Sequence, residues 1–513
     1  MKRLIAQRQT LAFLLFLAGY FLLHIALRVA ISPSLDYDEA EQMLLSQWLL
    51  PGYTEQPPLY TWVQRLLFAL FGKGVFAISL LKNTLLFLTY LFVFLSARRA
   101  LNNERLAILA SLSLLFIPQI GWESQRDMTH TTLAVLAAAA TLWQVLRLLE
   151  RQNLGNYLVL GVILAVGILS KANYLLFAAV LFITLATFAE GRQLLFHRHM
   201  ALALCLALLL PSGYLWWMTE NRDIVFSATH KFKREALDFW YKGPASLVFK
   251  TFLFLTPLWL ILLLLFPQGL RGTLPPAEDL PPRLLQRLLL FLFIALLVVV
   301  LAGKVTYVKD RWLQPLLFIV PLVFFARLHR NQPTAPRFTL FIGLAGVAAL
   351  GIYLAFTLRV VAASYSGSFC RLNYPFAAIG ADLRALGFRE GVLISDDRFL
   401  AGNLHLLFPA SPALVPGYRF ERQLPAENSG LPAPGHRQLA VVWHAAQSLT
   451  LPDELRSYLA SAFAVTDIAA EPRVLRHRYL FARDETLDLA VLLIPLPRPP
   501  TEQKPQRPLA GKG

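Results

Sequence analysis

Long apolar stretches dominate the first 361 residues, and short polar segments separate them. Each apolar stretch is about 20 residues long, enough to cross a hydrocarbon core of roughly 30 Å as a helix. The pattern predicts an α-helical polytopic membrane domain over residues 1–361 with about eleven spans, near residues 11–31, 76–97, 106–120, 131–149, 157–170, 174–189, 200–217, 247–266, 284–301, 312–326 and 338–361.

The pattern changes after residue 361, where short apolar runs alternate with polar, helix-forming segments. Periodicity and turn residues predict helices at "FAAIGADLRALGF", "RFLAGNLHLLF" and "PDELRSYLASAF", and strands at "GVLISDD" and "QLAVVWHA". Residues 362–495 are therefore expected to form a small soluble α/β domain. The proline-rich and charged residues 496–513 are expected to be disordered.

Composition supports a membrane protein and explains most of the charge. Hydrophobic residues make up 56% of the 513 residues, only 15% are charged, and the mean hydropathy is +0.53. Lys and Arg concentrate at the N-terminus and in alternate loops, which places the N-terminus in the cytoplasm and the C-terminal domain outside. The net charge of +17 mostly reflects this orientation, so we expect no nucleic-acid binding. Cys205 and Cys370 lie in separate regions, and no disulfide is expected.

In that topology the exterior loops hold carboxylates early in the chain and cations later. Residues 32–75 form the first exterior loop. The candidate site residues are Asp36, Asp38, Glu39, Glu41, Glu55, Asp127, Lys171, His230, Lys231, Lys233, Arg234, Lys304, Tyr307, Lys309 and Arg311. His130 lies in the same loops and is expected to be structural rather than catalytic.

Each of these charges also has an ordinary structural explanation. Charged side chains at helix ends anchor the membrane interface, and the acidic patch fits the wet face of an interfacial helix. The exterior cations nevertheless run against the positive-inside trend. An anionic ligand at the exterior face, with phosphate as the natural candidate, explains their concentration.

The first loop resembles that of a known family. "DYDEAEQMLLSQWLL" follows the first apolar span, and "GYTEQPPLYTWVQRLLFALFG" comes next. An Asp-Glu pair, a "PPL" with aromatics and an "LFG" ending are similar to the first exterior loop of GT-C glycosyltransferases. Within that superfamily the group is that of the protein O-mannosyltransferases and the aminoarabinose and galacturonic acid transferases of lipid A. "QRDMTHTTL", "GILSKANYLL" and "YVKDRWLQPLLFIVP" match more loosely, and the resemblance spans about residues 10–330.

The resemblance implies an inner-membrane glycosyltransferase with its active site outside. Its donor would be a polyprenyl-phosphate sugar among the membrane lipids, and its acceptor a lipid, lipopolysaccharide or other envelope glycan, with inversion at the anomeric carbon. Asp38 is the expected general base, because a carboxylate within reach can take the acceptor's hydroxyl proton. Asp36 and Glu39 are its competitors. If the acceptor is itself a phosphate, Asp38 would instead position the sugar or a cation.

The remaining residues are expected to bind substrate. Cations lower the cost of the charge that develops on the leaving phosphate, and this role falls to Lys171, Lys304, Lys309 and Arg311. Glu55, His230 and Tyr307 are expected to contact the substrate, while Asp127 either orients a cation or sugar or caps a helix. No metal-binding motif is present in the sequence. The sequence does not require a divalent metal and leaves one open; the prediction is that no metal or other cofactor is used.

Two other functions are considered. A transporter or flippase for a lipid-linked glycan would carry charges inside its spans rather than in its loops. A membrane scaffold presenting the C-terminal domain would not need the excess of exterior cations.

Overall fold

The computed structural model describes residues 2–227, 237–269, 279–328, 333–418, 438–468 and 471–495. The chain divides into two compact units. The first contains Met1–Pro33 and Trp48–Cys370, and the second contains Ser34–Gln47 and Arg371–Gly513.

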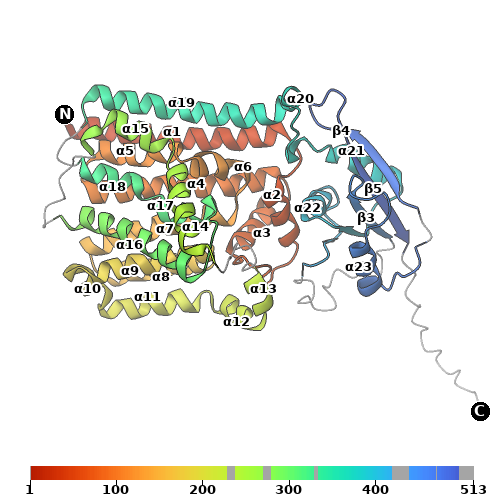
Figure 1. Cartoon of the computed structure of the whole chain (residues 1–513), viewed down its shortest axis with the longest axis horizontal. Helices are drawn as coiled ribbons and strands as arrows, with labels where there is room; N and C mark the ends of the chain where they lie inside the picture. Colours follow the sequence, from red (N-terminus) through yellow and green to blue (C-terminus); the bar gives the residue numbers. More distant parts are fainter. Residues whose placement is uncertain are drawn as a thin grey trace, which may run out of the picture. The chain divides into compact units, whose positions relative to one another are not determined.

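The first unit is helical, and its long helices run roughly parallel to one another (Figure 1). Its elements are α1 (Lys2–Ile31), α3 (Leu59–Phe71), α4 (Val75–Leu101), α5 (Glu104–Leu112), η1 (Ser113–Phe116), η2 (Gln119–Glu123), α6 (Ser124–Asp127), α7 (His130–Glu150), α8 (Leu154–Ile168), α9 (Ala172–Ala186), α10 (Ala189–Leu195), α11 (Arg198–Leu209), α12 (Ser212–Glu220), α13 (Arg222–Phe226), α14 (Phe239–Phe254), α15 (Leu258–Leu265), η4 (Pro267–Gly269), α16 (Leu280–Ala302), η5 (Asp310–Trp312), α17 (Gln314–Leu317), α18 (Val320–Arg327), α19 (Ala335–Val361) and α20 (Ala363–Ser366).

The eleven segments expected to cross the membrane are all helical. Within the described residues, five single helices are long and apolar enough to cross, or up to eight if each of three bent pairs is one span. The other three expected segments coincide with the shorter apolar helices Leu154–Ile168, Ala172–Ala186 and Gln314–Arg327. The count of eleven spans therefore stays a prediction.

Helix α7 lies at the centre of the first unit. Every residue from His130 to Leu142 is buried, and the helix packs against α4 on one side and α8 on another. The run Ala137–Ala140 keeps these contacts close, since small side chains let helix backbones approach in an apolar environment. This packing also fixes the polar residues of the first turn of α7 within the helical bundle.

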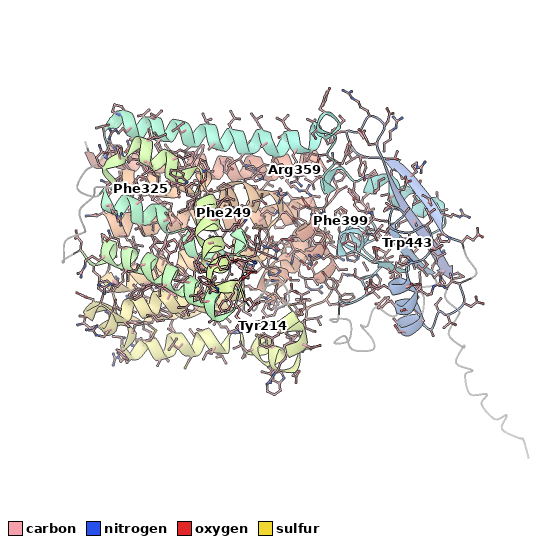
Figure 2. The ribbon with its side chains drawn as sticks, in the orientation of Figure 1. Tyr214, Phe249, Phe325, Arg359, Phe399 and Trp443 are labelled. Atoms are coloured by element: carbon pink, nitrogen blue, oxygen red, sulfur yellow. The ribbon has the colours of Figure 1, made fainter. Side chains whose placement is uncertain are left out.

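The second unit is built on a five-stranded sheet with the strand order β2-β1-β3-β5-β4. Strand β1 is parallel to β2 and β3, while β5 is antiparallel to β3 and β4. Figure 2 labels Phe399 on α22 and Trp443 on β3, which are both buried. The elements are α2 (Tyr37–Leu45), η6 (Arg371–Asn373), α21 (Phe376–Ala385), β1 (Val392–Ser395), α22 (Arg398–Leu407), β2 (Ala413–Leu414), β3 (Gln438–His444), α23 (Asp453–Phe463), β4 (Arg473–Arg478) and β5 (Thr486–Pro495).

All five elements expected after residue 361 are present, as α21, β1, α22, β3 and α23. The sequence pattern did not predict β2, β4 and β5. Residues 34–47 were expected to belong with the membrane helices, whereas the structure packs them as α2 into the second unit. Tertiary contacts explain this difference. Apolar helices of the first unit precede and follow α2 in the sequence, but α2 buries its apolar face against α22.

Some predicted features fall outside the described residues. These are the expected disordered tail at residues 496–513 and the site candidates His230, Lys231, Lys233 and Arg234.

Candidate functional site

The acidic patch of the first loop forms helix α2, and two of its carboxylates cap that helix. Asp36 is the N-cap, and its side chain accepts a hydrogen bond of 2.8 Å from the backbone N–H of Tyr37. The Glu39 carboxylate accepts a hydrogen bond of 3.0 Å from the backbone N–H of Asp36. This reciprocal capping box satisfies orphan donors of the first turn. Asp36 and Glu39 therefore have a structural task at the start of α2.

Two arginines of the second unit hold the first turn of α2. The guanidinium carbon of Arg371 lies 4.4 Å from the centre of the Tyr37 ring, and that of Arg398 lies 4.2 Å from it. Arg371 is also 3.5 Å from the Asp36 carboxylate. Cation–π contacts of this kind are attractive, so the residue immediately before Asp38 is held by two cations.

Glu41 anchors the next turn of α2. Its carboxylate forms an ion pair with Arg398 and accepts a hydrogen bond of 2.9 Å from the Tyr418 hydroxyl. Burial and the nearby Glu41 carboxylate raise the pKa of Tyr418 well above its ordinary value, so the hydroxyl keeps its proton as a donor. Glu41 is thus an attachment point of α2 to the C-terminal unit.

A second group of polar residues lies in the helical unit, where α7 and α9 begin. Glu55 and Lys171 both lie close enough to His130 to interact with it electrostatically. The Lys171 ammonium donates a hydrogen bond of 2.6 Å to the hydroxyl of Thr131, and the His130 ring lies 5.6 Å from that of Tyr60. The structure therefore brings two predicted site residues, Glu55 and Lys171, close to His130, although the three are far apart in the sequence.

The loop that carries Glu55 is held by its own hydrogen bonds. The Tyr53 hydroxyl donates to the carbonyl of Trp48 at 2.7 Å, and the Trp62 indole donates to the carbonyl of Leu50 at 2.8 Å. Gly52 approaches the Trp217 ring so closely that a Cβ at this position would lie 2.3 Å from it. Only glycine fits this contact without a shift.

Residues 304–314 join the same region through polar contacts. Asn173, two residues after Lys171, donates a hydrogen bond of 3.2 Å to the carbonyl of Trp312. Asp310 forms an ion pair of 3.1 Å with Lys250 and accepts a hydrogen bond of 3.5 Å from Gln119. Lys309 is partly buried beside Asp310 in this segment.

The other candidates lie at exposed positions of residues 304–311 or at the end of α6. Lys304 and Arg311 are exposed, and the Lys304 ammonium lies 5.9 Å from the centre of the Phe239 ring. Tyr307 is 41% exposed, and its ring lies 5.1 Å from the Lys250 ammonium. Asp127 ends α6 and does not cap α7, whose N-cap is Thr129.

Two buried or paired cations were not among the predicted site residues, because they lie inside apolar helices. Lys82 of α4 is 2% exposed, and its neighbour Asn83 accepts a hydrogen bond of 3.0 Å from Gln125. Lys250 of α14 pairs with Asp310. The available signal was a lysine within an otherwise apolar run, which is costly and therefore marks a candidate functional site.

In the part of the chain that the structure describes, neither a metal-binding cluster nor the cavity below includes residues of α2 or of the polar group at the start of α7 and α9. Among the described residues, no cluster of three or more His, Cys, Asp or Glu side chains is placed to hold a metal ion. A cavity of about 320 Å³ lies between α1, α5 and α19. Gln9 is the one polar side chain in its lining, and none of the site candidates lines it.

Comparison with known proteins now identifies the family. Residues 55–217 match the family described as dolichyl-phosphate-mannose-protein mannosyltransferase. The chain is 32% identical over 477 residues to the lipopolysaccharide core galacturonosyltransferase RgtB of Rhizobium johnstonii, covering 91% of this chain and 94% of the relative. It is 30% identical over 475 residues to RgtA of the same organism, covering 89% and 91%.

The fold has a solved counterpart as well. The crystal structure of ArnT from Cupriavidus metallidurans bound to undecaprenyl phosphate aligns over 94% of this chain and 98% of ArnT, with a TM-score of 0.61 and 15% identity. Together these findings show that the chain is a membrane glycosyltransferase of the GT-C family, in the group that includes the lipopolysaccharide core galacturonosyltransferases.

Proposed function

We propose that this enzyme transfers galacturonic acid from a polyprenyl-phosphate donor to the core of lipopolysaccharide at the exterior face of the inner membrane. The observation that carries the proposal is the identity of 32% to a lipopolysaccharide core galacturonosyltransferase along 91% of the chain. The ArnT structure with undecaprenyl phosphate supports the donor class, because it shares the fold. The cations of the candidate site suit a donor that carries both a phosphate and a carboxylate.

The proposed reaction is a single displacement with inversion. The acceptor hydroxyl oxygen attacks the anomeric carbon, and a new bond from carbon to oxygen forms. The bond from that carbon to the phosphate oxygen breaks, and its electron pair leaves with the polyprenyl phosphate. Asp38 takes the hydroxyl proton as the general base, the role that the resemblance of the first loop implies for it. Its competitors Asp36 and Glu39 form the capping box of α2.

The leaving phosphate gains negative charge during this step. Lys171 is our first choice to stabilise that charge, since its ammonium is held by a hydrogen bond to Thr131. It also lies close enough to His130 to interact with it electrostatically. Lys309 is the second, since it adjoins the Asp310–Lys250 ion pair. We propose that the donor or the acceptor contacts the exposed side chains of Lys304, Tyr307 and Arg311. Asp127 is proposed to orient a cation or the sugar.

The topology and cofactor expectations belong to the same proposal. We place the N-terminus in the cytoplasm and the C-terminal unit in the periplasm, following the distribution of Lys and Arg. We propose that no metal is required, so EDTA treatment of the purified enzyme should leave the transfer rate unchanged. A loss of rate that added divalent metal restores would contradict this point.

A transfer assay with purified protein tests the function. Polyprenyl-phosphate galacturonic acid and core lipopolysaccharide are the substrates, and the wild type is compared with Asp38→Asn. We expect transfer by the wild type and a loss of about 10²- to 10⁴-fold in kcat for the variant, the range for a lost general base. No transfer by the wild type from this donor would overturn the proposed substrate, and an active Asp38→Asn would overturn the base.

A further inference from the structure

Helix α2 carries the proposed base, yet its attachments are to the C-terminal part of the chain. The helix lies 324 residues or more before the second unit resumes at Arg371, and it packs mainly against α22. We propose that α22 is the positioning element for Asp38, and that Arg398 is its principal positioning residue. This inference rests on the proposed role of Asp38 as the base.

The backbones of the two helices touch at one point. A Cβ added to Gly402 of α22 would lie 2.1 Å from the carbonyl oxygen of Ala40 in α2. Ala40 is itself fully buried. A contact this close between backbones leaves no room for α2 to slide along α22, since even a methyl group would force the helices apart.

Hydrogen bonds fix α2 at both of its ends. Before the helix, the backbone N–H of Leu35 donates to the Asn403 side chain at 2.8 Å. After it, the Gln47 side chain accepts a hydrogen bond of 2.8 Å from the N–H of Ala413 and donates one of 3.0 Å to its carbonyl. These bonds link the helix to α22 and to the edge strand β2, so its ends cannot move independently of the sheet.

Arg398 joins these contacts to the turn that contains Asp38. Its guanidinium pairs with Glu41, donates to the Tyr418 hydroxyl at 3.0 Å and stacks over Tyr37. The guanidinium can do all three at once because it is planar, delocalised and rich in donors. Asp38 lies between Tyr37 and Glu41 in the sequence, and both of these residues contact Arg398. The backbone of Asp38 is therefore held on both sides by one side chain of α22.

Helix α22 is itself fixed to the sheet. Asp397 caps it, accepting a hydrogen bond of 3.0 Å from the N–H of Phe399. The Phe399 ring lies 4.9 Å from that of Tyr374, and the buried His405 ring is 2.9 Å from the carbonyl of Ser411. Any displacement of the C-terminal unit therefore carries the proposed base with it.

The test is a double-mutant cycle in the purified full-length enzyme. Arg398→Ala should lower kcat by about 10- to 100-fold, the size expected for a displaced catalytic group, and leave the donor KM unchanged. In the Asp38→Asn background the same substitution should cause no further loss, because Arg398 acts through Asp38. Arg398→Lys should recover part of kcat, since it restores the charge but not the planar stack.

Arg384→Ala is the matched control. Arg384 stacks over Phe408 at 4.7 Å and donates to the carbonyl of Leu407 at 3.0 Å, as Arg398 does with its own partners, but these contacts do not involve α2. It should keep wild-type kcat. Wild-type kcat in Arg398→Ala, or a further loss in the double variant, would overturn the inference while leaving the base in place. Full activity of Asp38→Asn would overturn both.

Discussion

At the scale of single residues, the structure assigns structural tasks to three carboxylates of the acidic patch. Asp36 and Glu39 satisfy backbone groups at the start of α2, and Glu41 pairs with Arg398. Asp38 stays the proposed base because of the resemblance of the first loop to that of GT-C enzymes and because a carboxylate within reach can take a hydroxyl proton. In the helical unit, we propose that Lys171 stabilises the leaving phosphate, because its ammonium is held by a hydrogen bond to Thr131.

The role of Lys171 gives a prediction with a close control. Lys171→Met removes the cation proposed to stabilise the leaving phosphate, and kcat should fall by about 10²-fold, the scale for losing one such electrostatic group. Thr131→Val removes only the hydroxyl that receives its hydrogen bond, so it should cost much less. Steady-state kinetics of both variants check this. Equal losses would show that Lys171 acts only by holding α7.

Two aspartates of the C-terminal unit should respond to pH in opposite directions. Burial raises the pKa of the Asp396 carboxyl, and the charge of His444 opposes this shift. The stability that the protonated carboxyl contributes is therefore lost as the pH rises through the folded-state pKa. The hydrogen bond from Arg476 lowers the pKa of Asp488, so its contribution is present at neutral pH and lost on acidification.

Thermal unfolding of the full-length protein checks both signs. Asp396→Asn should raise the melting temperature at neutral pH, and the difference from the wild type should shrink on acidification as the wild-type carboxyl takes up its proton. Asp488→Asn should lower it at neutral pH, by a smaller amount because its ion pair with Arg476 is largely exposed. The same sign of change in both variants would contradict this electrostatic account.

At the scale of elements, the contact between α2 and α22 is the tightest constraint on the acidic helix. Gly402→Ala places a methyl group against the Ala40 carbonyl and must push α2 away from α22. We expect a loss in kcat of about 10-fold or more. Gly343→Ala in α19 is the control, because a Cβ there meets nothing within 4 Å. Wild-type kcat in Gly402→Ala would show that α2 tolerates the shift.

The local sequence pattern predicted most helices and strands of the C-terminal unit. It failed where tertiary contacts determine the structure. The periodicity of "FAAIGADLRALGF" and the apolar run "QLAVVWHA" were enough to find α21 and β3. Strand β4, "RVLRHR", has too many charged residues for an apolar pattern and is ordered by pairing with β5. The packing of α2 on α22 depends on Gly402 and Arg398, which lie more than 350 residues from their partners, and sequence pattern carries no such information.

At the scale of the whole molecule, chain orientation decides whether the candidate site faces the periplasm. Cysteine labelling of intact cells tests it, with Cys205 and Cys370 replaced so that each variant carries one thiol. Glu220→Cys and Asn102→Cys suit the purpose because both positions are exposed. Glu220→Cys should react with an impermeant reagent from outside and Asn102→Cys only after lysis. The reverse result would invert the topology.

The central claim is that this membrane glycosyltransferase consumes a polyprenyl-phosphate sugar to build lipopolysaccharide. The most direct measurement compares the lipids and the lipopolysaccharide core of a deletion strain with strains that express the wild type or Asp38→Asn. We expect polyprenyl-phosphate galacturonic acid to accumulate, and the core to lack galacturonic acid, in both the deletion strain and the variant. Expression of the wild type should return the donor to its normal level and complete the core. A complete core and no accumulated donor in the deletion strain would contradict it.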